Sequence, residues 1–310
     1  MPQATRDIKR RIKSVASTKK VTKAMEMVSA AKMRRAVAGV LASRSYSDLA
    51  WQLVSRLVLE SAGELHPLLT RREKVKKAAL VMISGNRGLC GGFNAQIIQR
   101  TNRYLKEQSD KGIDVSLITV GKKGRDFMAK KNYPLVADFI KADATVDITE
   151  IRPLAHLLIE GYLAGQFDKV ALAYTDFISA LVQKPTIIEI LPLPSSDGND
   201  LGRVSSQLPI SNFPGPSEAE GRIAALEYLF EPSPVEVLNE LLPRMLETKI
   251  YQAVLEANAS EHSARMVAMR NASEAAGDMI SELTLIFNKA RQAGITAELA
   301  DISGGRAAVE

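Results

Sequence analysis

The sequence has little cysteine, little histidine and two long stretches without proline, and each scarcity removes a class of protein. Cys90 is the only cysteine, so an internal disulfide and a cysteine-based zinc site are both excluded. His66, His156 and His262 lie far apart in sequence, which gives no metal-ligand spacing. No run of about 18 apolar residues is present, and the N-terminus lacks the apolar core of a secretory signal. We therefore expect a soluble, cytoplasmic chain with no structural metal and no cofactor.

The chain is long enough to bury a core, since its 310 residues are 46% hydrophobic. Proline is absent from residues 3–66 and again from 244–310, and proline breaks helix interiors at a cost of roughly 3 kcal/mol. Both ends are therefore predicted to be long helices. A helix of about 58 residues would reach about 85 Å, well beyond the width of a small domain, so it must protrude or find a partner.

The C-terminal stretch carries an apolar seam whose members alternate by three and four residues. Its positions are Met266, Met269, Ser273, Ala276, Ile280, Leu283, Phe287, Ala290, Gly294 and Ala297. Because many of them are small, two backbones can approach closely there. The N-terminal stretch keeps the same steps at Ile8, Ile12 and Val15, and then becomes small or polar at Thr18 and Thr22. The pattern predicts a coiled coil, and an ordinary helical bundle is the alternative.

Between the two ends, strand-like and helix-like segments alternate, which is typical of an α/β domain with a mostly parallel sheet. The strands are expected in "AALVMIS", "DVSLITV", "KVALAY" and "PTIIEILPL". The helices are expected in "FNAQIIQRTNRYLKEQ", "KKGRDFMAKK" and "TEIRPLAHLLIEGYLAGQ". Residues 75–194 would form this domain. Residues 195–222 are rich in Ser, Gly and Pro, which predicts a flexible loop.

The loop "SGNRGLCGGFN" at residues 84–94 lies between a predicted strand and a predicted helix, where phosphate-binding loops also occur. Neither phosphate fingerprint fits. A Walker loop needs Lys and Ser or Thr after its last glycine, whereas Phe93 and Asn94 follow here. The dinucleotide pattern allows one residue between its first glycines, and two stand between Gly85 and Gly88. The glycines are also what a tight exposed turn requires, so we interpret the loop as a surface presented to another protein.

Three separated segments carry a family resemblance. They are "STKKVTKAMEMVSAAKMRRA" near the start, "RGLCGGFN" in the middle, and "SEHSARMVAMRNASEAAGDMISELTLIFNKARQAGITAELADISGG" at the end. Together they resemble the gamma subunit of F-type ATP synthases. The resemblance implies an α/β fold in which the long terminal helices pair as an antiparallel coiled coil beside a central Rossmann-like domain. The expected segments are a shaft helix (1–66), the base domain (75–194), an insertion loop (195–222), and a foot with the C-terminal shaft helix (227–310).

The resemblance also implies a function without chemistry in the chain itself. A gamma subunit is the central rotor, which couples ion flow through the membrane ring to ATP synthesis or hydrolysis on the beta subunits and regulates ATPase activity. The implied partners are three alpha and three beta subunits, the epsilon subunit and the ring of c subunits, with no nucleic acid and no direct membrane insertion. The implied location is the cytoplasmic face of the cell membrane, as a peripheral part of the complex.

Particular residues match family positions that contact the catalytic ring. These are Lys23, Met25, Lys32, Arg34, Arg35, Cys90, Arg265, Arg291, Gln292, Thr296 and Glu298. The N-terminal residues and Cys90 also have a plainer interpretation. Met25 could simply pack in the seam, the basic N-terminal positions could form a solvated face, and Cys90 could be a small buried thiol.

The segment "EYLFEPSP" resembles the foot that rests on the membrane ring, with Tyr228, Phe230 and Glu231 at the matching positions. Ordinary packing within the foot is the alternative. One position departs from the family pattern: the usual acidic residue before "RGLCGG" is Asn86 here.

Two other classes of protein remain open from the sequence. The first 60 residues hold 13 Lys or Arg against 4 Asp or Glu, so a basic coiled-coil nucleic-acid-binding or adaptor protein is one alternative. A nucleotide-dependent enzyme built on the α/β domain is the other, although no catalytic pair or triad is apparent.

Overall fold

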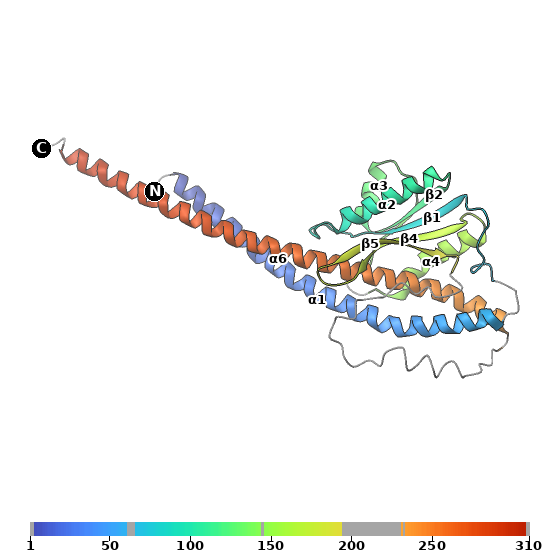
Figure 1. The fold of residues 1–310 in the computed structure, drawn as a ribbon. Helices are drawn as coiled ribbons and strands as arrows, with labels where there is room; N and C mark the ends of the chain where they lie inside the picture. The colour runs from blue at the N-terminus through green and yellow to red at the C-terminus, as the bar shows by residue number, and fades with distance from the viewer. Residues whose placement is uncertain (1–2, 61–65, 144–145, 194–230, 232, 308–310) are drawn as a thin grey trace. The chain divides into compact units, whose positions relative to one another are not determined.

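The computed structural model describes residues 3–60, 66–143, 146–193, 231 and 233–307. The chain divides into two compact units. One contains residues 1–31 and 265–310, and we call it the shaft unit. The other contains residues 32–264, and we call it the base unit. The two longest helices, α1 (Gln3–Glu60) and α6 (Pro234–Ala307), each contribute to both units (Figure 1). The predicted insertion 195–222 lies outside the described residues.

In the shaft unit the two long helices pair in an antiparallel coiled coil. The hydroxyl oxygens of Thr22 and Ser273 lie 2.7 Å apart, and Ser273 Oγ also donates to the carbonyl of Lys19 at 3.4 Å. A Cβ on Gly277 would come within 2.8 Å of Lys19 Nζ. Thr22 contacts Ser273, and the earlier residue Lys19 contacts the later residue Gly277. The residue numbers decrease along α1 while they increase along α6, so the helices run in opposite directions. The antiparallel pairing that the resemblance implied is confirmed within this unit.

The predicted seam agrees with the burial pattern over most of its length. Met269, Ser273 and Ala276 are buried, and the positions from Ile280 to Gly294 are half-buried between exposed neighbours. Stepping one heptad from the Thr22 and Ser273 pair places Val15 opposite Ile280, and a second step places Ile8 opposite Phe287. All four of these side chains are half-buried. Two predicted positions differ, because Thr18 and Ala297 are exposed.

The base unit is built on a five-stranded sheet in the order β3-β2-β1-β4-β5. Its strands are β1 (Lys77–Ile83), β2 (Asp114–Val120), β3 (Leu135–Phe139), β4 (Lys169–Phe177) and β5 (Gln183–Leu191). The first four are parallel, and β5 pairs antiparallel with β4. The mostly parallel sheet was predicted correctly. The order of the strands could not be predicted from the sequence.

Helices cover both faces of this sheet, which explains why the central strand β1 is apolar throughout. Alternate residues of β1 belong to two different cores. Ala79, Val81 and Ile83 pack with α4 (Ile148–Leu163) and with parts of α1 and α6. Leu80 and Met82 pack instead with α2 (Phe93–Asp110) and α3 (Lys122–Lys130). The base unit is therefore a three-layer sandwich with the long helices in one outer layer (Figure 1).

Two features of the base unit differ from the sequence-based expectation. Strand β3 was not predicted, because it is a five-residue edge strand with only alternate side chains half-buried. Helix α6 begins at Pro234 and runs through Pro243, although proline was expected to delay the helix. Leu238, Leu242 and Leu246 around that proline are fully buried, so packing offsets the hydrogen bond that proline removes. The long N-terminal helix, by contrast, has the expected 58 residues.

Candidate functional site

The carboxyl ends of parallel strands are where α/β sheets of this kind bind ligands, at the point where the strand order reverses. In this sheet that point lies between β1 and β4, since β1 leads to β2 on one side and pairs with β4 on the other. A polar section of α6, residues 258–263, occupies this edge. Ser260 Oγ donates to the carbonyl of Thr175 at 3.1 Å, and Ser263 Oγ donates to the carbonyl of Ala180. The chain thus covers its own crevice with a helix.

The glycine loop after β1 is held in place by side chains of the protein. The backbone N–H of Gly85 donates to Asn94 Oδ1 at 2.8 Å, and Asn94 Nδ2 donates to the carbonyl of Arg87 at 3.2 Å. Gly91 and Leu89 both have positive φ, at 55° and 62°. That conformation is unusual for leucine, and it leaves the Leu89 side chain 65% exposed. The loop therefore presents an apolar side chain at its tip, in a conformation that the Asn94 contacts fix.

Asn86, which departs from the acidic residue of the family pattern, bridges the start of α3 and the segment after β3. Its Nδ2 donates to the carbonyl of Lys141 at 2.6 Å, and its Oδ1 accepts from the backbone N–H of Lys122 at 3.3 Å. An ionised aspartate has no donor and could not make the first of these bonds. The amide at this position thus has a structural role that a carboxylate lacks.

Cys90 is buried inside the same loop. Its Sγ lies 3.2 Å from Asn94 Nδ2, which donates to it, and 3.9 Å from the carbonyl of Arg87. The prediction that Cys90 approaches a beta subunit stays a prediction. In this structure the exposed groups that the loop offers are those of Arg87 and Leu89.

The predicted ring-contact residues on α1 lie in different environments. Lys23 forms an exposed i,i+3 ion pair with Glu26 at 3.0 Å, and Met25 is half-buried in the shaft unit. Lys32 belongs to the base unit, where its Nζ lies 2.7 Å from Asp143 Oδ2. Arg34 and Arg35 are exposed in the base unit as well. The basic stretch is therefore not one uniform solvated face, since Lys32 already has an acidic partner in the chain.

On α6 the predicted residues fall at two levels. Arg265, the first α6 residue of the shaft unit, is buried. Arg291, Gln292, Thr296 and Glu298 are exposed, and Thr296 Oγ1 donates back to the carbonyl of Gln292 at 3.0 Å. The structure thus groups these four near the end of α6 and separates them from Arg265.

The predicted foot can be followed at one position only. Glu231 is exposed, whereas Tyr228 and Phe230 lie outside the described residues.

A second junction between α6 and β4 involves two carboxyl groups. Glu256 is buried on α6, and Asp176 lies near the end of β4. Burial raises the pKa of Asp176, against the opposing effects of the neighbouring Glu256 and of the charge of Lys184.

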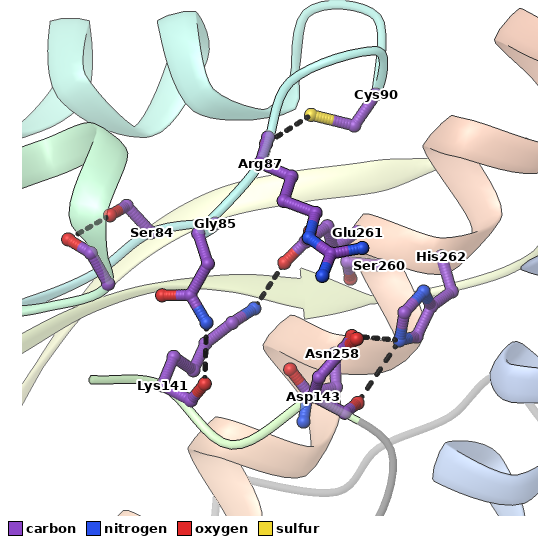
Figure 2. Close-up of polar contacts among 12 residues, drawn as sticks. Ser84, Gly85, Arg87, Cys90, Lys141, Asp143, Asn258, Ser260, Glu261 and His262 are labelled. Atoms are coloured by element: carbon purple, nitrogen blue, oxygen red, sulfur yellow. Dashed lines mark hydrogen bonds and ion pairs between the residues drawn. The ribbon is translucent and has the colours of Figure 1, made fainter.

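A cluster of buried polar groups on and around α6 was not predicted from the sequence. Lys141 and Glu261 form a buried ion pair, Asn258 Nδ2 donates to the carbonyl of Ala142 at 3.1 Å, and His262 contacts Asp143 (Figure 2). The signal was present as the polar run "SEHS" inside an otherwise helical stretch. This run lies before the heptad seam that begins at Met266, so its spacing did not indicate which side of the helix is buried.

Among the residues that the structure describes, no cluster of His, Cys, Asp or Glu could hold a metal ion. Within the same residues, none of the helices has a stretch long and apolar enough to cross a membrane. The described residues show two long helices, with exposed side chains near the end of α6, and an α/β base unit in which α6 lies along the carboxyl edge of the sheet. These features define an α/β protein with a paired-helix shaft.

Comparison with known proteins identifies the family. The family model described as ATP synthase matches residues 4–309. The chain is 44% identical to the ATP synthase gamma chain of Pelotomaculum thermopropionicum over 305 residues, covering 98% of this chain and 99% of the relative. It is 43% identical to the gamma chain of Heliobacterium modesticaldum over 304 residues, covering 98% of each. The chain therefore belongs to the ATP synthase gamma chain family, and it is a non-catalytic subunit of that enzyme.

Solved structures share the fold. A chain of the mitochondrial ATP synthase of Euglena gracilis superposes with a TM-score of 0.62 at 20% identity, covering 99% of this chain and 94% of that one. A chain from the central stalk and c-ring structure of Tetrahymena thermophila ATP synthase gives a TM-score of 0.57 at 22% identity, covering 82% of this chain and 99% of that one.

Proposed function

We propose that this chain is the central rotor shaft of an F-type ATP synthase. It would couple ion flow through a membrane ring of c subunits to ATP synthesis or hydrolysis on three beta subunits, which alternate with three alpha subunits around it. The epsilon subunit would bind at its base, and the assembly would lie at the cytoplasmic face of the cell membrane. Family membership supports this assignment over a nucleic-acid-binding or adaptor protein.

The end of α6 carries the observation on which the proposal depends. The heptad register places Ile8 opposite Phe287, and the described part of α1 begins at Gln3. Residues of α6 beyond Gln292 therefore have no described residue of α1 opposite them. On this section Ile295, Leu299 and Ile302 form one apolar stripe, and they are 49%, 59% and 69% exposed. A helix that displays such a stripe is suited to a partner protein that covers it.

Coupling in such a rotor depends on contacts between the shaft and the beta subunits that change with the orientation of the shaft. A beta subunit can be biased only by the difference between the contacts that the shaft makes in one orientation and in another. Arg291 and Gln292 are exposed one turn before the apolar stripe, and we propose that they bond polar or acidic groups of a beta subunit in some orientations only. Lys23, Met25, Arg34, Arg35, Thr296 and Glu298 are further contact candidates. The foot around Glu231 is proposed to meet the c ring.

The test removes Arg291 and Gln292 together by alanine substitution in the assembled complex. A charge-assisted bond contributes roughly 1.5 to 3 kcal/mol, and about 1.4 kcal/mol at the rate-limiting step is a tenfold change in rate. We expect the complex to assemble and to bind nucleotide normally on its beta subunits, yet to hydrolyse ATP about tenfold more slowly.

A matched control removes the same two side-chain types from the base unit. Gln99 and Arg103 are exposed one turn apart on α2, and their double alanine variant should leave the hydrolysis rate unchanged. Normal turnover and ion pumping in an assembled R291A/Q292A complex would remove these two residues from the coupling step. A wild-type chain that failed to co-purify with alpha and beta subunits would refute the rotor assignment itself.

A further inference from the structure

Three consecutive residues after β3, residues 141–143, contact both long helices at once. They bond α6 through Asn258, Glu261 and His262, and they bond α1 through Lys32. Lys32 is the first residue of α1 in the base unit, and His262 is two residues from the last base-unit residue of α6. The segment therefore holds both helices near the limit of the base unit.

Lys141 is the most deeply buried member of this segment, with 3% of its surface exposed. Its Nζ forms an ion pair with Glu261, which is also buried, and lies 5.6 Å from the centre of the Phe93 ring at the start of α2. A Cβ on Gly85 would approach the Glu261 carboxylate to 3.1 Å, so the glycine loop closes over the pair. The carbonyl of Lys141 accepts the bond from Asn86. Lys141 thus joins α6 to the loop and helix that follow β1 (Figure 2).

The next two residues extend these contacts along α6 and across to α1. The carbonyl of Ala142 accepts from Asn258 Nδ2 at 3.1 Å. His262 Nε2 lies 3.2 Å from the carbonyl oxygen of Asp143 and 3.3 Å from its Oδ1. Because a carbonyl oxygen only accepts, Nε2 must carry the hydrogen. The other carboxylate oxygen of Asp143 binds Lys32 at 2.7 Å, so one side chain links α1 and α6.

On α6, Ser260 and Ser263 also bond the end of β4 and the segment that follows it, whereas the contacts between α1 and α6 at this level are apolar. Ala36 and Val40 of α1 pack against Leu255 and Ala259 of α6 and against Phe177 of β4. Hydrophobic contact is non-directional, and small side chains resist sliding or twisting of a helix weakly. Hydrogen bonds and ion pairs depend steeply on angle and distance. Rotating α6 by one residue position, about 100°, would break every bond that it makes to residues 141–143.

We propose that residues 141–143 form a collar that fixes α1 and α6 against rotation relative to the base sheet and so carries torque between the base and the shaft helices. Lys141 and Asp143 are then positioning residues for coupling, acting far from any nucleotide. This inference rests on the proposed rotor function. It also explains why Lys32, a basic residue matching a family contact position, has an acidic partner within its own chain.

The experiment replaces the buried ion pair by apolar residues of similar size. The Lys141→Met and Glu261→Met double variant keeps the volume of the pair, and such exchanges are often neutral for folding. Membrane vesicles whose complexes carry wild-type or variant chain are supplied with ATP. Hydrolysis is measured together with the membrane potential reported by a voltage-sensitive dye, a readout that does not depend on which ion is pumped. We expect hydrolysis to persist while pumping per ATP hydrolysed falls about tenfold, the factor corresponding to one charge-assisted hydrogen bond.

The control removes an ion pair of the same domain that touches neither long helix. Arg125 Nη1 lies 3.3 Å from Asp138 Oδ2, and the Arg125→Met and Asp138→Met double variant should keep the wild-type ratio. A second collar variant, Asp143→Ala, changes a half-exposed side chain and removes both carboxylate links, to Lys32 and to His262 Nε2, without disturbing the buried pair; the backbone carbonyl of residue 143 keeps its bond to His262. If the first variant fails to fold, this one still tests the collar.

The outcomes separate the collar from the rotor assignment. Wild-type ratios of pumping to hydrolysis in both collar variants would overturn the collar while leaving the rotor function intact. An equal decrease in the ratio of pumping to hydrolysis in the Arg125→Met and Asp138→Met control would also overturn the collar. A wild-type chain that restored neither hydrolysis-driven potential nor assembly in gamma-deficient membranes would instead refute the rotor function.

Discussion

The seam of the shaft unit gives the sharpest stability prediction, because three positions on the same section of α6 differ in whether they face α1 or solvent. Ala276 is 8% exposed in the seam, Ala290 is half-buried further along it, and Glu274 is exposed and pairs with Arg270 at 3.1 Å. We consider replacing each of them, one at a time, by arginine. The chemistry of the new side chain is then constant and only its location changes.

At Ala276 the new charge would enter the tightest part of the helix pair. The adjacent Thr22 and Ser273 hydroxyls already satisfy one another, and Lys19 lies over Gly277, so the guanidinium meets a like charge and no acidic partner among these contacts. Arginine can bend its stem toward solvent, which limits the cost of burial. We estimate about 2 kcal/mol of destabilisation at Ala276 and about half of that at Ala290. At Glu274 only an exposed ion pair is lost, which costs about 0.5 kcal/mol.

The assay is thermal unfolding of the full chain followed by circular dichroism at the helical minimum. The expected order of melting temperatures is wild type, then Glu274→Arg, then Ala290→Arg, then Ala276→Arg. Equal melting temperatures for the three variants would refute the register fixed by Thr22 and Ser273. A Glu274→Arg variant less stable than Ala276→Arg would place the seam on the opposite side of α6.

Two further predictions concern single contacts. Thr22→Val alone should destabilise the shaft by about 1 kcal/mol because Ser273 loses its hydroxyl partner, whereas Thr22→Val with Ser273→Ala should be nearly neutral; additive losses in denaturant unfolding would contradict this. Burial raises the pKa of Asp176, which faces Glu256 and Lys184, so the stability it contributes is present below its ordinary pKa of 3.8 and is lost as the pH rises through the raised value. In the wild type the melting temperature should therefore decrease as the pH rises above 3.8, and it should decrease less in Asp176→Asn. The same pH dependence in both proteins would show that Asp176 is not the cause of the decrease.

The parts of the fold predicted correctly from the sequence are those with a strong repeating signal. The absence of proline and the three-and-four spacing were enough for the long helices, and most of the seam from Met266 to Gly294 agrees with the burial pattern. The buried strands β1, β2 and β4 were visible as apolar runs. Strand β3 was not, because only three of the five side chains of this edge strand are half-buried, which gives a weak apolar pattern.

The candidate site was harder to predict, since its decisive contacts join residues far apart in the chain. Nothing local to Lys141 indicates that it will be buried against Glu261, because a lysine before a loop is usually solvated. Lys32 was assigned by its match to the family, and its bond to Asp143 follows only from the arrangement of α1 beside the loop after β3. The family resemblance predicts which residues contact partner subunits, whereas the partners of those residues within the chain follow only from the three-dimensional structure.

Helix α6 changes its chemistry in stages along its length, and each stage suits a different neighbour. Leucines from Leu238 to Leu246 are buried in the core of the base unit. Polar residues from Asn258 to Ser263 bond the carboxyl edge of the sheet, where backbone carbonyls offer acceptors that an apolar helix would leave unsatisfied. Small residues follow in the seam with α1, and an apolar stripe around Leu299 ends the helix in exposed surface. A sheet edge that binds a ligand in other α/β proteins is thus suited here to holding a helix by directional bonds, which is what a part that must transmit rotation requires.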